Sequence, residues 1–143
     1  MTEHKPMDAE FPLAVHALVY LLHTERITSS EELADNICTN PARVRKVMAR
    51  LSKAGYVTSM RGRYSGYTVE KSLRKVTLKE VLDALNETCI CENWKSGDIH
   101  RDCQVSSGMG GVMDGIYGEL NDVCDRQLQK ITVGNVFQKI FQK

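Results

Sequence analysis

The first part of the chain carries the hydrophobic periodicity of packed helices. Residues 11–22, FPLAVHALVYLL, are apolar on most sides, and Pro12 stands near the start, where a missing N–H costs little. This pattern predicts a buried first helix. Thr28 and Ser29 are each followed three residues later by a glutamate, which is the capping-box pattern and predicts a short helix from Ser30 to Ile37.

A third helix is predicted within TNPARVRKVMARLSKAG. Asn40 is a good N-cap, Pro41 suits the first helical position, and Gly55 follows the last turn. One face is apolar, with Val44, Val47, Met48 and Leu51 at helical spacing. Another face collects cations, namely Arg43, Lys46, Arg50 and Lys53, with Arg45 on its flank. A helix of this kind is a candidate for a phosphate-lined groove.

The stretch MRGRYSGY, residues 60–67, lies between two β-prone segments, YVTSM and YTVEK, and so predicts a hairpin. Helix, short turn, basic helix and basic hairpin, in this order, form a winged helix-turn-helix. In such domains the second helix of the motif enters the major groove, and the hairpin lies along the backbone or the minor groove. Arg61 and Arg63 would then contact groove or phosphate, and Gly62 and Gly66 would permit a tight turn. The alternative is an exposed hairpin with incidental arginines.

The second half of the chain begins with another amphipathic segment, VTLKEVLDALN, from Val76. A polar stretch without periodicity follows and predicts a loop of variable order. From Val105 the apolar spacing is helical again to about Lys130, and a last short helix is expected from Thr132. The fold class is therefore mainly α with a small β-hairpin (α+β).

The long predicted helix has an unusual composition, because Gly108, Gly111, Gly115 and Gly118 line up along one stripe. Each glycine costs roughly 1 kcal/mol relative to alanine, so another surface must hold this helix. A symmetric dimer explains the stripe better than a helix folded back on its own domain does. The two DNA-binding domains of such a dimer can bind a palindromic site. The expected interface comprises Gly111, Val112, Gly115, Ile116, Leu120 and Val123.

The predicted organisation is a winged helix-turn-helix domain at 1–86, a cysteine-containing sensor loop at 87–104, and a dimerisation helix with a C-terminal helix at 105–143. A chain of 143 residues suits one domain with an appendage. No apolar run is long enough to span a bilayer, and no secretory signal is present at the start of the sequence, so we expect a cytoplasmic location and no membrane partner.

Charge is distributed unevenly along the chain. Between Arg43 and Lys75 there are ten Lys or Arg residues and one acid, Glu70, so this window carries +9. Because the whole chain carries only +1, the remainder carries −8. A strongly basic block in a near-neutral protein points to a polyanionic partner.

Four blocks of the sequence together resemble a known family: AVHALVYLL, ITSSEELADNICTNPARVRKVMARLSKAGYV, RGRYSGYTV and VTLKEVLDALNE. They are similar to the IscR/NsrR/CymR family of small bacterial winged-helix transcription regulators over 11–87. A weaker likeness extends through Cys103 to ITVGNVFQKI. The resemblance implies that the N-terminal domain binds double-stranded operator DNA and that the long helix forms a homodimer.

The positions that match the family also suggest DNA contacts. Thr39, Asn40, Arg43 and Lys46 would lie at the DNA end of the recognition helix, and Arg61, Arg63 and Tyr64 would form the wing. The full predicted set is Thr39, Asn40, Pro41, Arg43, Lys46, Arg50, Arg61, Arg63 and Tyr64. Ser65 replaces the first of two glycines usual in the family. Arg43 stands where the family often has an aromatic, so base preference cannot be transferred.

The cysteines leave two readings open. Several relatives hold an iron–sulfur cluster with three loop cysteines, and here the loop offers Cys89, Cys91 and Cys103, with His100 nearby. Their spacing departs from the family pattern, because one residue separates Cys89 from Cys91 and Cys103 lies twelve residues after Cys91. We therefore expect no cofactor, with a cluster on these three residues as the alternative.

The second reading is a thiol switch at Cys103. At a helix N-terminus beside Arg101 and His100, its thiolate would be favoured, and it could pair with Cys89, Cys91 or the partner subunit. Five cysteines are an odd number, and a disulfide scaffold is not expected in such a chain. Cys38 and Cys124 are interpreted as ordinary thiols, for which burial is a sufficient explanation.

These observations predict a homodimeric DNA-binding transcriptional regulator, with repression favoured, that responds to a redox or small-molecule signal through the Cys89–Cys103 region. One alternative is a sensor-regulator that binds an iron–sulfur cluster. A further alternative is a winged-helix module that binds protein. The sequence shows no phosphate-binding glycine loop, metal-type histidine pair or nucleophile elbow, so no enzymatic activity is expected.

Overall fold

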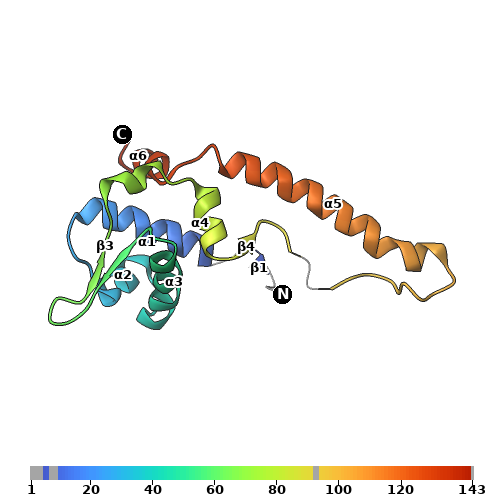
Figure 1. The fold of residues 1–143 in the computed structure, drawn as a ribbon, viewed down its shortest axis with the longest axis horizontal. Helices are drawn as coiled ribbons and strands as arrows, with labels where there is room; N and C mark the ends of the chain where they lie inside the picture. The colour runs from blue at the N-terminus through green and yellow to red at the C-terminus, as the bar shows by residue number, and fades with distance from the viewer. Residues whose placement is uncertain (1–4, 7–9, 92–93, 143) are drawn as a thin grey trace.

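The computed structural model describes residues 5–6, 10–91 and 94–142 (Figure 1). In chain order the elements are β1 (Lys5–Pro6), α1 (Glu10–Thr24), α2 (Ser30–Ile37), α3 (Pro41–Lys53), β2 (Thr58–Met60), β3 (Gly66–Thr68), the 3₁₀ helix η1 (Lys71–Lys75), α4 (Leu78–Ala84), β4 (Glu87–Thr88), α5 (Gln104–Leu128) and α6 (Val133–Phe141). The predicted class is confirmed: the chain is mainly helical, with a small antiparallel β-sheet. The outermost residues of the predicted N- and C-terminal segments, and 92–93 in the loop, lie outside the described residues.

The hydrophobic core is built around α1, which packs against α2, α3, α4 and α6. α3 contributes the apolar face that its sequence predicts, and Val44, Val47, Met48 and Leu51 are at most 1% exposed. Each fully buried side chain of this size contributes roughly 1.5–3 kcal/mol relative to exposure. This packing fixes the rotation of α3 about its axis, so that the other side of the helix faces outward.

Local capping sets the helix boundaries. The Ser29 side chain accepts a hydrogen bond from the Glu32 N–H at 3.0 Å, and the Asn40 side chain accepts one from the Arg43 N–H at 2.9 Å. The predicted start of α2 and the predicted N-cap of α3 are thereby confirmed. The helix predicted from Val76 begins two residues later, because Thr77 caps it in a reciprocal pair with Glu80.

The wing is anchored to the turn between α1 and α2. β2 and β3 pair antiparallel, with Met60 opposite Gly66. The buried Thr28 then adds two backbone hydrogen bonds to Tyr67, of 3.0 and 2.9 Å. Gly66 lies at this junction with φ +154°, and a Cβ added there would come within 2.6 Å of the Thr28 carbonyl oxygen. A glycine is therefore required where the wing meets the domain.

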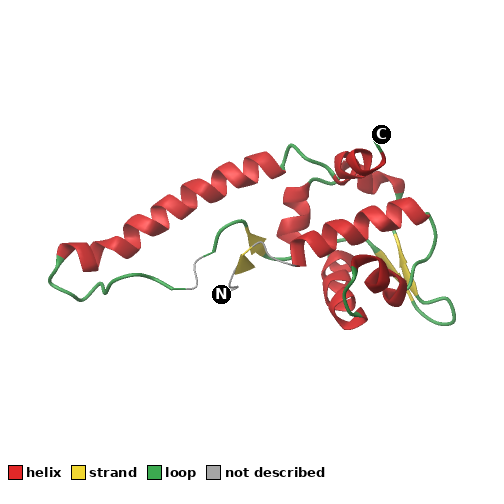
Figure 2. Ribbon diagram, turned by 180° about the vertical axis from the view of Figure 1, so that it is seen from behind, coloured by secondary structure: helices red, strands yellow, loops and turns green. Residues whose placement is uncertain are grey.

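The long helix α5 projects from the rest of the molecule (Figure 2). Its 25 residues extend about 37 Å. Leu128, in the last turn, is the one residue of this helix that is buried. The loop that precedes it contacts the first half of the helix. Lys95 forms an ion pair with Asp114 at 2.6 Å, and the Asp98 N–H donates to the Ser106 carbonyl at 3.0 Å.

The chain returns to the domain through α6. Val133 and Gly134 are buried where this helix meets η1 and α1. The last helix was predicted to start at Thr132, and this residue is its N-cap, in a reciprocal pair with Asn135. Within the described part of the chain, no helix combines the length and hydrophobicity needed to cross a membrane.

We predict that Gly66→Ala lowers the free energy of unfolding by about 1–3 kcal/mol, because the new methyl group overlaps the Thr28 carbonyl. Ser65→Ala, at the exposed neighbouring position, is the matched control and should change stability by less than about 0.5 kcal/mol. Denaturant unfolding followed by circular dichroism measures both. Equal stability of the two variants would show that the wing root is not packed as described.

Candidate nucleic-acid interface

The outward side of α3 is cationic. Arg43, Arg45, Lys46 and Lys53 are exposed along it. Lys46 lies 3.4 Å from Glu10, and Arg45 lies 3.8 Å from Glu31. The Arg45–Glu31 pair is exposed on both sides and contributes little, whereas Lys46 is exposed but its partner Glu10 retains only 14% of its side-chain surface.

Arg50 differs from the other predicted contacts because its guanidinium is used inside the domain. It donates to the Leu85 carbonyl at 2.7 Å and lies 3.7 Å from Glu10. The hydrogen bond connects α3 to the end of α4. This geometry favours a structural role for Arg50 over the predicted DNA contact.

The N-terminal end of α3 carries the other predicted contacts of this helix. The Asn40 side chain caps the helix, so its carbonyl oxygen is occupied by the Arg43 N–H. Thr39 is half-buried, and its N–H donates to the Ala34 carbonyl at 2.9 Å. Cys38 ends α2 in the left-handed conformation, with φ +67°. The tight turn between α2 and α3 leaves the first turn of α3 at the surface.

The wing presents a second basic group. Arg61, Gly62, Arg63, Tyr64 and Ser65 are all exposed, and Tyr64 retains 74% of its accessible surface. Gly62 has φ +97°, so the turn uses its conformational freedom. Figure 1 shows α3 and the wing turn both on the lower side of the domain, with the turn at the left end, and α5 and α6 on the upper side. Two basic elements that follow one another in the sequence thus share one side of the domain.

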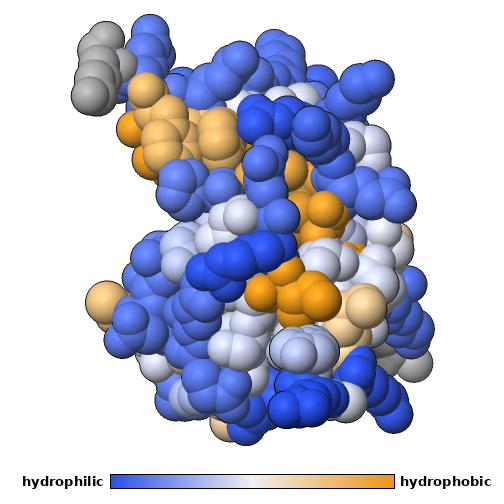
Figure 3. Space-filling model, turned by 90° about the vertical axis from the view of Figure 1, so that its left-hand side faces the viewer, coloured by the Kyte–Doolittle hydropathy of each residue, from blue (hydrophilic) through white to orange (hydrophobic). Residues whose placement is uncertain are grey.

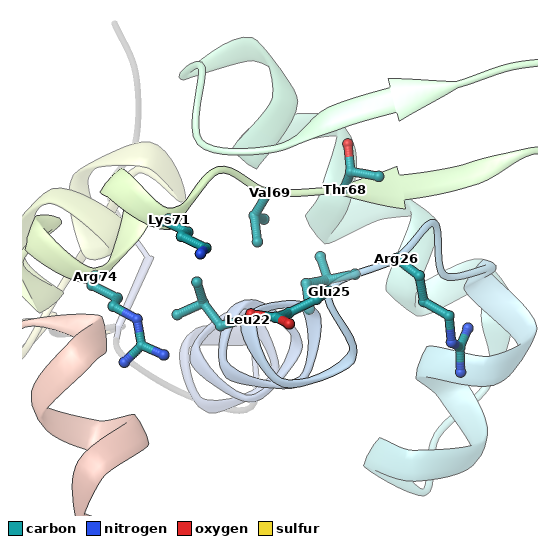
Figure 4. Close-up of a pocket in the computed structure, with 8 residues that line it drawn as sticks. Leu22, Glu25, Arg26, Thr68, Val69, Lys71 and Arg74 are labelled. Atoms are coloured by element: carbon teal, nitrogen blue, oxygen red, sulfur yellow. The ribbon is translucent and has the colours of Figure 1, made fainter.

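The surface near the wing also has a concave region. Seen from this end, the molecule is mainly hydrophilic in its lower part, with hydrophobic side chains toward the middle and top (Figure 3). A cavity of about 580 Å³ lies between the end of α1, β3 and η1, with Leu22 and Val69 facing it (Figure 4). Three cations line it, Arg26, Lys71 and Arg74. Arg26 pairs with Glu32 at 2.7 Å, and the Arg74 guanidinium lies 4.3 Å from the centre of the Phe137 ring. A second cavity of about 580 Å³ lies between α1 and α6.

The cysteines are arranged differently from the sequence prediction. Cys89 and Cys124 form a disulfide, with their Cα atoms 6.4 Å apart. The interpretation of Cys124 as an ordinary thiol is therefore wrong. The two residues are 35 positions apart and meet because α5 passes beside the segment that follows α4.

The three loop cysteines do not come together. Cys103 begins α5, whereas Cys89 is bonded to Cys124, 21 residues further along that helix and about 30 Å away. Among the described residues, no three cysteine, histidine or carboxylate side chains are placed to share a metal ion. The residues present therefore do not fit a cluster held by Cys89, Cys91 and Cys103 of one chain.

Cys103 is an exposed free thiol at the N-terminus of α5. The backbone N–H groups of Ser106 and then Val105 favour its thiolate and lower the pKa of Cys103 below its ordinary value. The sequence predicts this direction from the helix terminus. The neighbouring cation Arg101, which the sequence also suggests as a cause, does not contribute to this pKa shift.

α5 exposes an apolar stripe. The six side chains along it retain between 37% and 67% of their accessible surface, and they are Val105, Met109, Val112, Ile116, Leu120 and Val123. Beside them, Gly108, Gly111, Gly115 and Gly118 have open space around their α-carbons. A contiguous apolar stripe of this kind is typical of an interaction surface.

Comparison with known proteins identifies the family. The Rrf2 family, described as "Iron-dependent Transcriptional regulator", matches residues 7–139. The chain belongs to the Rrf2 family. It is thus a DNA-binding transcriptional regulator.

The Rrf2 assignment agrees with individual relatives. YwnA of Bacillus subtilis (strain 168), which bears the name of an HTH-type transcriptional regulator, is 25% identical, with 94% of this chain and 99% of YwnA covered. A Lactobacillus plantarum crystal structure described as a transcriptional regulator has a TM-score of 0.80 at 21% identity, over 93% and 90% of the two chains. CymR of B. subtilis, named the global cysteine regulator, has a TM-score of 0.67 at 15% identity, over 97% and 98%. IscR of T. potens also has a TM-score of 0.67, at 18% identity, over 94% and 87%.

We predict that Cys103 reacts with iodoacetamide at a lower pH than an ordinary thiol, whose pKa is about 8.5. Since the Ser106 N–H favours the thiolate, Ser106→Pro should move the midpoint of the rate–pH profile upward. Ser106→Ala keeps the N–H and is the matched control. Mass spectrometry of the Cys103 peptide gives the rates, and identical profiles for the proline and alanine variants would contradict this assignment.

Proposed function

We propose that this Rrf2-family regulator acts as a homodimeric repressor that reads a palindromic operator with α3 and the wing, and that a redox signal reaches it through its cysteine-containing loop. The observation that carries the proposal is the pairing of two exposed basic elements on one side of the domain. The first two turns of α3 provide Arg43 and Lys46, and the wing provides Arg61, Arg63 and Tyr64.

The two elements would have different tasks. A recognition helix inserts its N-terminal residues into the major groove, which assigns Arg43 to base edges, supported by Thr39 and Pro41. A wing lies against the backbone or minor groove, which assigns Arg61 and Arg63 to phosphates. Lys46 could also contact a phosphate, because its side chain is 57% exposed although its Nζ lies 3.4 Å from Glu10. Asn40 would position this turn mainly as its cap.

The dimer is supported by α5. Its apolar stripe and its glycines face away from the chain's own domain, and burying such a surface is the main driving force of association. A twofold symmetric pairing of α5 uses one self-complementary stripe, with Gly111, Val112, Gly115, Ile116, Leu120 and Val123 in contact. Two winged domains would then face two half-sites of a palindrome.

The proposed signal acts on the cysteines. CymR, a structural neighbour, is named a cysteine regulator, which agrees with sulfur chemistry as the input. The iron-dependent description of the family favours a cluster, but the separation of Cys103 from Cys89 does not support one within a chain. A protein-binding winged helix would expose an apolar or mixed face, whereas α3 exposes Arg43, Lys46 and Lys53.

We predict that Arg43→Ala and Arg61→Ala weaken DNA binding in different ways. Arg43→Ala should cost about 1–3 kcal/mol and relax the preference at one base pair, because it removes a base contact. Arg61→Ala should weaken binding to all sequences and lower the salt slope by about 1, because it removes a phosphate contact. Fluorescence anisotropy at several salt concentrations measures both effects.

Lys139→Ala is the control for these variants, since Lys139 is an exposed lysine on α6, away from α3. It should bind as the wild type does. If all three variants bind DNA equally, α3 and the wing are not the DNA-binding surface.

We predict that Gly115→Leu dissociates the dimer. A Cβ at this position meets nothing within 4 Å in the chain itself, so the substitution leaves the fold intact while blocking close approach of a second α5. Overpacking of about 1–3 kcal/mol should raise the dimer dissociation constant roughly 10- to 100-fold. Gln138→Leu introduces the same side chain at an exposed position of α6, and it serves as the control. Light scattering over a dilution series measures the dimer dissociation constant. If Gly115→Leu remains as dimeric as the wild type, the glycines of α5 are not part of the dimer interface.

A further inference from the structure

We propose that Cys89 and Cys124 form a reversible dithiol–disulfide site, whose oxidation fixes α5 relative to the winged helix-turn-helix domain and raises affinity for paired operator half-sites. The inference rests on the proposed dimeric DNA-binding function and specifies the chemistry of its signal. It replaces the predicted role of Cys103 with a pair of residues that the structure brings into contact.

The disulfide joins the DNA-binding domain to the dimerisation helix. Cys89 directly follows β4, at the end of the domain, and Cys124 lies one helical turn before the buried Leu128 of α5. Next to the bond, the Ile90 N–H donates to the Asn121 side-chain carbonyl, and the Asn121 side-chain amide donates to the Ile90 carbonyl, both at 2.9 Å. One turn of α5 is thus clamped to the segment that leaves α4.

Because of its position, this clamp restricts the orientation of α5 relative to the winged helix-turn-helix domain. Further toward the N-terminus of the helix, the polar contacts that the structure gives α5 are with its own loop, as in the Lys95–Asp114 ion pair. On the domain side, Lys79 lies 3.5 Å from Asp125, one residue after Cys124. An ion pair that is partly exposed to water holds a helix less firmly than a covalent bond.

The direction of α5 determines the geometry of the dimer. Two recognition helices must be about 34 Å apart to enter successive major grooves on one side of DNA. In a dimer joined through α5, this spacing depends on the angle between α5 and each winged domain. A bond that restricts the angle lowers the conformational entropy lost on binding two half-sites and so increases affinity.

The surroundings of the disulfide favour reversibility. Cys89 and Cys124 are both half-buried, so small reactants can reach them. Cys91, two residues from Cys89, is also half-buried and lies outside this disulfide. In compartments that hold DNA, most thiols are kept reduced, and a disulfide there is usually transient and redox-sensing.

The reaction needs a two-electron oxidant, for which we name hydrogen peroxide. The thiolate of one cysteine attacks a peroxide oxygen and becomes a sulfenic acid, and after proton transfer one water leaves. The second thiolate then attacks the sulfenic sulfur, the S–S bond forms, and a second water leaves. A dithiol reductant reverses the reaction, because its two thiols become a disulfide as Cys89 and Cys124 regain their protons.

The test uses the full-length wild-type protein in two forms, oxidised with peroxide and reduced with dithiothreitol. Peptide mapping by mass spectrometry should find the Cys89–Cys124 link in the oxidised form and its loss in the reduced form. The DNA is a palindromic duplex selected from a random library by the oxidised protein, together with a duplex that carries one half-site. Reduction should weaken binding to the palindrome about fivefold or more and leave half-site binding unchanged.

Variants separate this pair from the other cysteines. Cys124→Ser and Cys89→Ser should bind the palindrome at the reduced level whether or not peroxide is present. Cys103→Ser and Cys38→Ser should keep the wild-type response. Half-site binding reports whether each variant remains folded, and the wild-type comparison needs no substitution at all.

The outcomes also separate this inference from the proposed function. If no Cys89–Cys124 link forms, if dithiothreitol fails to break it, or if both forms bind the palindrome equally, the redox site is overturned while DNA binding stands. If neither the oxidised nor the reduced protein retains any duplex from the random library, the proposed function fails. The control of DNA affinity by this cysteine pair then fails with it.

Discussion

The burial of one face of α3 against α1 is the interaction on which the rest of the molecule depends. Val44, Val47, Met48 and Leu51 are almost fully buried, so the helix has one preferred rotation about its axis. The side opposite to this packing therefore carries Arg43, Arg45 and Lys46 into solvent. The same core holds Thr28, to which the wing is bonded through Tyr67. A hydrophobic constraint thus places two basic elements on one side of the domain.

A second constraint comes from what the chain leaves uncovered. α5 extends away from the domain with a stripe of partly exposed apolar side chains, and its glycines make it a weak helix in isolation. The helix is attached to the domain near its C-terminal end, through Leu128, the Asn121–Ile90 hydrogen bonds and the Cys89–Cys124 disulfide. The winged helix-turn-helix domain therefore lies on one side of the attachment point, and the exposed apolar stripe of α5 lies on the other.

The sequence predicted features that depend on neighbouring residues. The boundaries of α2 and the start of α3 follow from Ser29 and Asn40, whose capping bonds span three residues. The wing follows from β-prone segments around a glycine-containing turn, and the lowered pKa of Cys103 follows from its place at a helix start. The DNA contacts and the dimer contacts were also chosen on local patterns, and they stay predictions.

Features that depend on distant pairs could not be predicted in this way. The bond between Cys89 and Cys124 joins residues 35 positions apart, and with five cysteines many pairings are compatible with the sequence. The contact of Arg50 with the Leu85 carbonyl, also 35 residues away, changes its expected role for the same reason. The pairing of β1 with β4 depends on the path of the whole domain between them. Each needs the tertiary arrangement that a local pattern does not encode.

Hydrogen–deuterium exchange of the protein with and without a selected operator duplex tests the central claim most directly. The account predicts slower exchange on DNA addition in α3 and along the wing, with α6 unchanged, because bound DNA covers the first two and not the third. Protection confined to α6 or to the α1–α6 surface, with α3 and the wing exchanging as in the free protein, would contradict it.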